Sequence, residues 1–243
     1  MKQVVVSERL NTVISFVEPG NRFADVGTDH GFVPICLVQR GVCPGGLAMD
    51  VREGPLERAR RHIREYGLEK QIETRLGDGF SAMRPGEADT GILAGMGGPL
   101  MIRILEAGRE QVKSLRELIL SPQSEIEEVR AYIRERNFRI VREAMLCEDG
   151  KYYTVMKVSL TECAPEPEPG FSRAEDRYGA LLLRMRDPVL KEFLEREEEK
   201  RTDILRRLSA QPGKEMRSQE RVAELSDQIR QIREIREHYY EVQ

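Results

Sequence analysis

Short apolar runs alternate with longer amphipathic segments between residues 23 and 160. Five of these runs have the length and composition of β-strands: RFADVG, GGLAMD, QIETRLGDG, DTGILAGMGG and ELILSP. Strands that alternate with helices along a chain form mainly parallel sheets covered by helices on both faces. The pattern therefore predicts an α/β fold of the doubly wound type.

Amphipathic periodicity predicts helices over residues 32–39, 53–66 and 125–137. The second of these should stop at Gly67, a residue that readily adopts the left-handed conformation at a helix end. After the third, two β-rich runs flank Asp149-Gly150, which is a hairpin signal. We expect these last two strands to be antiparallel to each other and to complete a seven-stranded, Rossmann-like sheet.

The segment TECAPEPEPG, residues 161–170, is rich in proline, glycine and glutamate and predicts a linker. It separates a first domain, residues 1–160, from a helical, coiled-coil-like domain, residues 171–243. In that domain we expect a helix over residues 178–208, a turn at 211–213 and a second helix. The second helix has a heptad seam: Val222, Leu225, Ile229, Ile232, Arg236 and Tyr239. The seam pairs either within an antiparallel hairpin, with residues 178–185 as a third element, or with another copy.

Composition narrows the class of protein without identifying it. No apolar run approaches the ~18 residues of a membrane span, and the N-terminus lacks a signal-peptide pattern, so we expect a cytoplasmic protein that binds no membrane. The cysteines lack the spacing of a zinc site and predict reduced, structural thiols and no metal: Cys36, Cys43, Cys147 and Cys163. The net charge of −3 does not exclude nucleic acid, since local patches bind phosphate.

Candidate chemistry gathers at the predicted strand ends, where ligands bind in open parallel sheets. The first strand runs into Asp25, Gly27, Asp29 and Gly31, with an aspartate where a glycine-rich turn would have glycine. Other strand ends also carry acids or small residues: Asp50 after the second, Asp78 and Gly79 after the third, and Gly95, Met96, Gly97 and Gly98 after the fourth. These residues predict one polar cleft.

The acids in this cleft favour a cationic ligand. A pyrophosphate needs backbone N–H donors and no nearby anion, so Asp25 and Asp29 argue against a dinucleotide. S-adenosylmethionine carries a sulfonium and an ammonium group and fits better. Asp50, about 20 residues after the first turn, suits two ribose hydroxyls, and Asp78 suits an exocyclic amine.

Seven segments together resemble the bacterial tRNA (adenine-22-N1)-methyltransferases: RLNTVISFV, ADVGTDHG, EGPLERAR, GDGF, GILAGMGG, ILEAG and EDGKYY. The resemblance implies a Rossmann-like methyltransferase fold, S-adenosylmethionine as cofactor and tRNA as partner. It places the cofactor site on Asp25, Gly27, Asp50, Asp78, Gly79, Gly95 and Met96. Asp50 departs from the family, whose members often have glutamate there.

The fourth strand bears on the target atom. Enzymes that methylate an exocyclic adenine amine usually have Asn or Asp followed by two prolines and an aromatic residue at this strand end. This chain has Ala94-Gly95-Met96-Gly97-Gly98, with no side-chain amide or carboxylate. That composition suits attack by ring atom N1, whose lone pair is already available.

Roles for several charged residues stay open at this stage. Asp29 either binds the target base as a catalytic carboxylate or caps the helix near Phe32, and His30 is either a hydrogen-bonding strut or a general base. Arg9, expected just before an N-terminal helix, either binds the cofactor carboxylate or lies in solvent. Two arginine series either contact tRNA or lie on solvated helix faces: Arg58, Arg60, Arg61 and Arg64, and Arg217, Arg221, Arg230, Arg233 and Arg236.

Two other functions remain open. The chain is either a small-molecule methyltransferase whose helices dimerise it, or a non-catalytic RNA-binding protein that retains a cofactor pocket. The sequence leaves the oligomeric state open as well.

Overall fold

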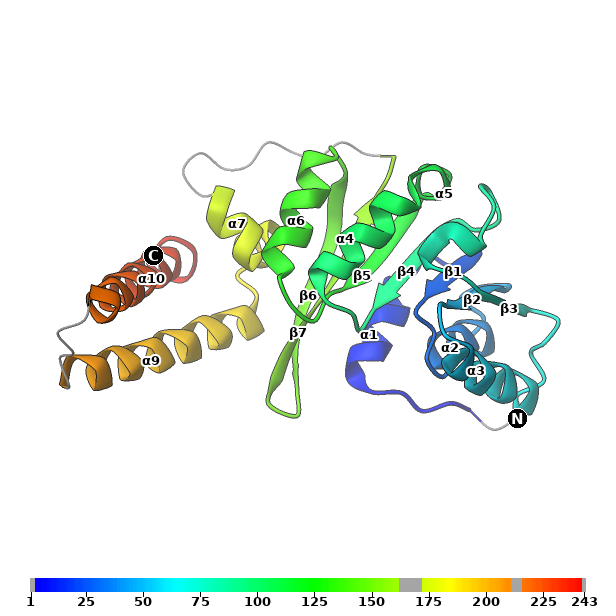
Figure 1. Cartoon of the computed structure of the whole chain (residues 1–243), viewed down its shortest axis with the longest axis horizontal. Coiled ribbons are helices and arrows are strands. Elements are labelled where there is room, and N and C mark those ends of the chain that lie inside the picture. Colours follow the sequence, from blue (N-terminus) through cyan, green and yellow to red (C-terminus); the bar gives the residue numbers. More distant parts are fainter. Residues whose placement is uncertain (1–2, 162–171, 211–215, 242–243) are drawn as a thin grey trace. The chain divides into compact units, whose positions relative to one another are not determined.

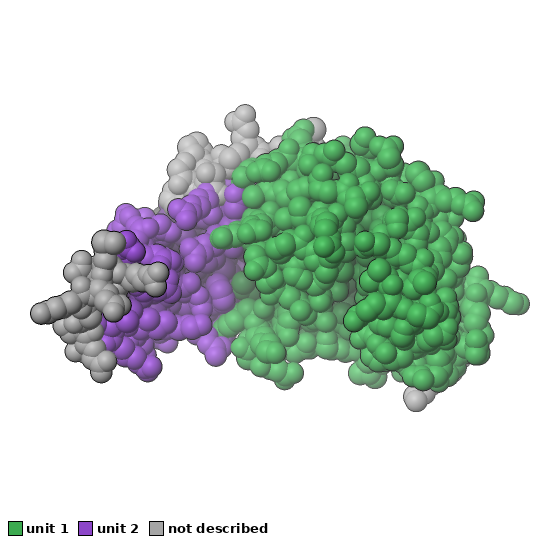
Figure 2. Space-filling model, in the orientation of Figure 1, with its two compact units in different colours: residues 1–172 green, residues 173–243 purple. Residues whose placement is uncertain are grey.

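The computed structural model describes residues 3–161, 172–210 and 216–241. The chain forms two compact units, Met1–Ser172 and Arg173–Gln243, which Figure 2 colours green and purple. Beyond Thr161, the predicted linker lies outside the described residues, and so does the predicted turn at residues 211–213.

The first unit contains a seven-stranded sheet (Figure 1). Its strands are β1 (Phe23–Val26), β2 (Gly46–Asp50), β3 (Ile72–Leu76), β4 (Thr90–Ala94), β5 (Glu117–Ser121), β6 (Arg139–Glu148) and β7 (Lys151–Ser159). The spatial order is β3-β2-β1-β4-β5-β7-β6, and β1 to β5 are parallel. β7 is antiparallel to both β5 and β6. The predicted sheet and terminal hairpin are confirmed.

Helices follow most of the strands in this unit. They are α1 (Glu8–Phe16), α2 (Phe32–Gln39), α3 (Glu53–Glu65), the 3₁₀ helix η1 (Gly79–Ala82), α4 (Gly98–Ala107), α5 (Arg109–Lys113) and α6 (Ile126–Glu135). The prediction for residues 125–137 was too long, because Glu125 and Asn137 both have positive φ angles, 46° and 58°. Gly67, with φ at 68°, follows α3 as expected. Arg9 was expected just before the N-terminal helix, but it lies inside α1.

Alternation along the buried strands gives the sheet two apolar faces. On β5, Ile119 joins the core under α1, α2 and α3, while Leu118 and Leu120 join the core under α4 and α6. All five residues of β5 are buried, as expected for a central strand covered by helices on both faces. Because successive side chains of a strand point to opposite faces, each buried strand packs against both layers of helices.

The strand order reverses between β1 and β4, which are neighbours in the sheet but not in the chain. Their connections leave toward opposite faces, so the chain separates beyond their carboxyl ends. This separation is the reason that the first unit has a cleft at this point.

The second unit contains α7 (Ser172–Tyr178), α8 (Ala180–Arg184), α9 (Pro188–Ala210) and α10 (Met216–Tyr240). Residues 178–208 do not form one continuous helix: α8 lies within residues 178–185, the predicted third element, and α9 begins at Pro188. Gly179 has a φ of 94° and separates α7 from α8. Asp187 then starts α9, since its Oδ1 accepts hydrogen bonds from the backbone N–H groups of Val189 and Leu190, both at 2.9 Å.

The helical seam pairs within the chain. Four of the predicted positions are buried: Leu225, Ile229, Ile232 and Tyr239. Arg236 is not among them, because Ile235 takes the buried position and Arg236 pairs with Glu198 of α9 at 2.5 Å. The hydroxyl of Tyr240 at the end of α10 donates to the carbonyl oxygen of Asp187 at the start of α9, at 3.0 Å. α9 and α10 therefore form an antiparallel hairpin.

Candidate functional site

A cleft of about 310 Å³ lies outside the carboxyl ends of β1 and β4. Its lining residues are Arg9, Leu10, Asp25, Gly27, Thr28, Asp29, His30, Gly31, Phe32, Val33, Ala94, Gly95 and Gln123. Five predicted site residues are among them: Arg9, Asp25, Gly27, Asp29 and Gly95. The fold thus brings together residues from α1, the β1 turn and the end of β4.

The turn after β1 exposes backbone to the cleft. The N–H groups of Gly27 and Thr28 both donate to the carbonyl oxygen of Met49 in β2, at 2.8 and 2.9 Å. Gly27 has a φ of 83°, a conformation that side chains rarely allow, and a Cβ there would lie 3.2 Å from the Met96 Cε. Met96 therefore packs across the turn from the β4 side, although it does not line the cleft.

Asp25 is a buried carboxyl group, only 6% exposed, on the floor of the cleft. Burial and the nearby Asp50 carboxylate raise its pKa to about 7. The structure gives it no cationic partner among the described residues. A cationic ligand would supply the missing charge and favour the ionised form.

Arg9 provides the opposite charge in the same cleft. Its Nη1 atom is buried and has no hydrogen-bond partner in the described part of the chain. The guanidinium carbon lies 5.4 Å from the centre of the Tyr153 ring, which supports one side of the group. A buried donor without a partner costs about 1–3 kcal/mol. Arg9 and Asp25 together suit the carboxylate and ammonium groups of an amino-acid moiety.

Asp29 does not cap α2, so that alternative is wrong. The N-cap is Gly31, and no side chain accepts a hydrogen bond at that helix start. Asp29 instead accepts from Arg58 of α3, with 2.5 Å between Oδ1 and Nη2. This hydrogen bond lowers the pKa of Asp29, whose side chain is 58% exposed. The cleft therefore has a stable anion at its mouth.

Three aromatic rings lie beside that anion. The His30 ring stacks on Phe32 and on His62 of α3, with centroids 5.3 and 5.6 Å apart. The carbonyl oxygen of His30 lies 2.9 Å from the His62 Nδ1. The Nε2 of the His30 ring lies 3.5 Å from the Asp29 Oδ2. His30 therefore contributes a partly exposed ring face and a contact to Asp29.

The other predicted acids, Asp50 and Asp78, do not line the cleft, although Asp50 is near enough to Asp25 to raise its pKa. Asp50 is buried, and its Oδ1 accepts from the backbone N–H of Arg52 at 2.8 Å. The N–H of Gly77 donates to the Asp50 carbonyl oxygen at 3.0 Å, which aligns the ends of β2 and β3. Asp78 is exposed, and Gly79 follows it with a φ of 58°. A Cβ at Gly79 would lie 2.8 Å from Ile104, so the close approach of α4 requires glycine.

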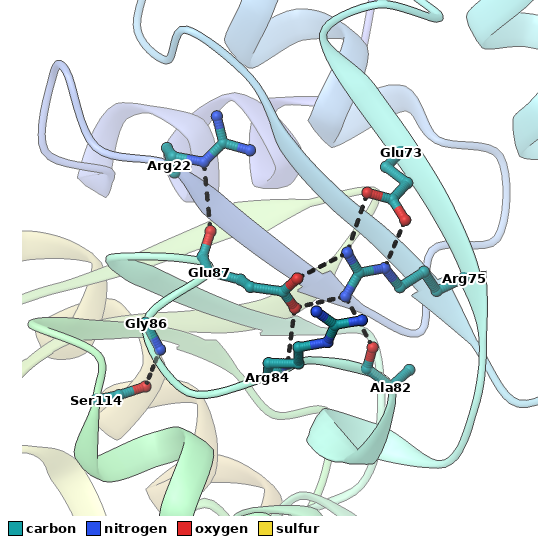
Figure 3. Close-up of polar contacts among 8 residues, drawn as sticks. All are labelled: Arg22, Glu73, Arg75, Ala82, Arg84, Gly86, Glu87 and Ser114. Carbon is teal, nitrogen blue, oxygen red and sulfur yellow. Dashed lines mark hydrogen bonds and ion pairs between the residues drawn. The ribbon is translucent and has the colours of Figure 1, made fainter.

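Arg75 on β3 contacts Ala82 and Glu87, which lie in the segment after β3 (Figure 3). Its five N–H groups donate to Glu73 at 2.7 and 3.0 Å, to Glu87 at 2.5 and 3.0 Å, and to the Ala82 carbonyl oxygen at 3.0 Å. Glu87 also accepts from the Arg84 N–H, and these bonds lower its pKa to about 2. We call Glu73, Arg75, Arg84 and Glu87 the Arg75 cluster.

Two cleft contacts were absent from the sequence prediction. Arg58 binds Asp29, although the sequence offered only RNA contact or solvent for it. Gln123, just beyond β5, lines the cleft and gave no motif signal. The acid at position 29 and the arginine at 58 lie on different elements, so only the packing of α3 beside the β1 turn joins them.

Most of the other arginines have carboxylate partners. On α3, Arg60 binds Glu53 and Glu57, and Arg61 lies 3.9 Å from Glu65. On α10, ion pairs engage Arg221, Arg230, Arg233 and Arg236. The Arg217 side chain lies outside the described residues. These pairs are typical of a solvated, ion-paired helix surface.

The cysteines divide by burial. Cys36 and Cys43 are buried, and burial raises the pKa of both thiols. Cys147 is exposed, so the expectation of a structural thiol does not fit it, and Cys163 lies outside the described residues. Among residues 3–161, 172–210 and 216–241, no group of three His, Cys, Asp or Glu side chains is arranged to hold a metal. No helix in these ranges is long and apolar enough to cross a membrane.

Comparison with known proteins adds three findings. A family model described as a methyltransferase domain matches residues 6–156. The tRNA (adenine(22)-N(1))-methyltransferase of Bacillus subtilis is 29% identical over 238 residues, covering 98% of this chain and 100% of the relative.

A solved structure of Streptococcus pneumoniae Sp1610, a candidate tRNA (m1A22) methyltransferase, is 33% identical with a TM-score of 0.84. The aligned region covers 95% of this chain and 99% of the Sp1610 chain. A second structure of that protein contains S-adenosyl-L-methionine, with 32% identity, a TM-score of 0.82 and the same shares covered. The likeness therefore extends over both units.

Proposed function

We propose a function on the premise that the chain belongs to the methyltransferase domain family and, within it, to the tRNA (adenine-22-N1)-methyltransferases. It transfers a methyl group from S-adenosylmethionine to N1 of an adenine in tRNA. The observation that carries this proposal is the cleft at the β1–β4 switch point. It pairs a buried Asp25 with a buried Arg9 Nη1, and among the described residues the first has no cation and the second no hydrogen-bond partner. A tRNA substrate favours a cytoplasmic location.

The charged residues in the cleft suit the amino-acid part of the cofactor: Arg9 would bind its carboxylate and Asp25 its ammonium group. Outside the cleft lining, Asp50 would bind its ribose hydroxyls and Asp78 its adenine amine. Gly27 and Gly95 line the cleft and leave room beside these groups, whereas Gly79 packs against Ile104 and Met96 packs across the β1 turn. When bound, S-adenosylmethionine supplies an electrophilic methyl group on a sulfonium.

The protein then has to place N1 of the adenine and stabilise the positive charge that develops on the ring. Ala94-Gly95-Met96 presents no side-chain acid or amide, which suits a ring nitrogen that needs no deprotonation before attack. Asp29 accepts a hydrogen bond from the N6 amine and offsets the positive charge that grows on the ring. Arg58 binds the Asp29 Oδ1, so the contact to N6 falls to Oδ2, which also lies 3.5 Å from the His30 Nε2.

Methyl transfer to bulk tRNA, followed by nucleoside mass spectrometry and mapping of the product, tests the function. We expect 1-methyladenosine at position 22, with NAD neither bound nor required. Transfer to small molecules alone would support a small-molecule methyltransferase, and cofactor binding with no transfer would support a non-catalytic RNA-binding protein.

Asp29→Asn tests the catalytic carboxylate separately. The amide keeps the size of the side chain but loses the charge, so turnover should fall by ~10² or more while cofactor affinity changes only a few-fold. The matched control is Asp203→Asn on α9, which removes a surface ion pair with Arg206 and should leave turnover unchanged. Near-normal turnover of Asp29→Asn would remove Asp29 from the mechanism.

A further inference from the structure

The end of β4 has no side-chain amide of its own, but the amide of a residue beyond β5 lies beside it. Gln123 lines the cleft together with Asp29 and Gly95. Its Nε2 lies 3.8 Å from the point that a Cβ on Gly95 would occupy, so the amide approaches the glycine directly. Gln123 thus supplies from the end of β5 the functional group that Ala94-Gly95-Met96 lacks.

The backbone fixes the position of Gln123. Its N–H donates to the Met96 carbonyl oxygen at 2.9 Å, and the Gly95 N–H donates to the Ser121 carbonyl oxygen at 3.1 Å. These two bonds join the ends of β4 and β5. The Gln123 side chain is exposed, and within residues 3–161 it has no hydrogen-bond partner. A fixed backbone with an uncommitted amide is suited to recognition of a substrate.

We propose that Gln123 recognises the target adenine by two hydrogen bonds to its N6 and N7 atoms, an inference that rests on the proposed function. A glutamine amide matches this edge of adenine, because its oxygen accepts from N6 and its NH₂ group donates to N7. The N6 amine has a second hydrogen, on the N1 side, for Asp29. This mode leaves N1 uncovered and open to the methyl group, whereas an amide on the N1–N6 edge would obstruct the attack.

The same contact gives specificity. Guanine presents a carbonyl oxygen in place of the N6 amine, so it would face the glutamine oxygen with another acceptor. A site that hydrogen-bonds a substrate group rejects analogues that lack the group, because its own polar atoms are then left unpaired. Gln123 is therefore a specificity residue that touches the substrate and does not hold the cofactor.

The test uses the full-length protein and two tRNAs that differ only at the target nucleotide, adenine or 7-deazaadenine, which lacks the N7 acceptor. We expect Gln123→Ala to lower kcat/KM on adenine tRNA by about 10- to 100-fold, within the range for a bidentate base contact. The 7-deaza substitution should cost the unaltered protein about tenfold and cost Gln123→Ala nothing further. Gln123→Glu keeps an acceptor for N6 but has no donor for N7, so it should also be insensitive to the 7-deaza substitution.

Two controls make the result specific. Calorimetry with S-adenosylmethionine should give Gln123→Ala an affinity within a few-fold of the unaltered protein, which also shows that the variant folds. Gln71→Ala, an exposed glutamine before β3 at the opposite edge of the sheet, should behave as the unaltered protein. Additive losses, unchanged kinetics of Gln123→Ala, or a loss confined to cofactor affinity would each overturn the inference. An unaltered protein that methylates no tRNA adenine would instead overturn the proposed function, and this inference with it.

Discussion

Arg9 and Arg75 are two half-buried arginines of the first unit with opposite hydrogen-bonding states. Every N–H group of Arg75 has an acceptor within the chain, from Glu73, Glu87 and Ala82. Arg9 has a buried Nη1 with no acceptor among the described residues and a tyrosine ring beside it. The fold satisfies the hydrogen-bonding groups of Arg75 but not those of Arg9.

This difference separates structural from ligand-binding charge. A folded chain tolerates an unpaired buried donor at a cost of about 1–3 kcal/mol, so few such atoms persist without a partner of some kind. The Arg75 cluster stabilises the segment after β3 by itself. Arg9 and Asp25 leave a donor and a buried carboxyl for a ligand, and they lie on one cleft. Four measurements test this contrast.

Asp25→Asn should have the largest effect. Removing the charge that binds the cofactor ammonium should weaken S-adenosylmethionine binding by ~100-fold or more, since buried charge-assisted hydrogen bonds contribute up to about 3 kcal/mol. Isothermal calorimetry measures it. The same variant should be as stable as the unaltered protein or more so at pH 8, because it removes an unpaired buried charge. A less stable variant with normal affinity would make Asp25 structural.

Arg9→Lys should weaken cofactor binding by ~10- to 30-fold, because lysine keeps the charge but loses the planar fork that matches a carboxylate. Its thermal midpoint should stay within about 2 °C of the unaltered value, since no hydrogen bond within the chain is lost. Calorimetry and thermal unfolding on the same samples check both. A lower midpoint with unchanged affinity would place Arg9 with Arg75 as a structural residue.

Cofactor affinity should rise with pH. Asp25 has a pKa raised to about 7 and must be ionised to pair with an ammonium group, so affinity should increase about tenfold between about pH 6 and pH 8. Because this folded pKa exceeds the ordinary value of 3.8, Asp25 lowers the free energy of unfolding as pH rises from about 4 to about 7, and the loss is complete above that pH. Asp25→Asn should remove the rise. Glu87, with a pKa of about 2, should add no pH dependence there.

Arg75→Ala should have the smallest effect on the ligand. It leaves Glu73 and Glu87 without their cation, so the free energy of unfolding should fall by ~1–2 kcal/mol. Cofactor affinity should fall only a few-fold, through loosening of the segment that carries Asp78. Denaturant unfolding and calorimetry measure the two. Arg109→Ala, which removes an exposed pair with Glu106, is the control and should change neither.

The sequence itself determined the layers of the first unit. Short apolar runs, the amphipathic segments between them and the Asp149-Gly150 hairpin signal identified all seven strands, since a strand buried on both faces reads as a continuous apolar run. Acids and glycines at the strand ends identified much of the cleft, because parallel strands bring their carboxyl ends to one edge. The sequence also carried the break between α8 and α9, since Asp187 is an N-cap residue followed by proline at the first helical position, but the prediction of a helix over residues 178–208 passed over it.

Only the tertiary structure decided which charges pair. Whether Arg58 meets Asp29, whether Arg9 keeps an unpartnered atom and where Gln123 lies all depend on how α1, α3 and the end of β5 pack around one turn. A hydrogen bond requires atoms within about 3 Å, while sequence periodicity places a side chain only on a face or at a strand end. Local sequence patterns therefore place the cleft, and the packing of distant segments decides which of its charged groups are paired within the chain.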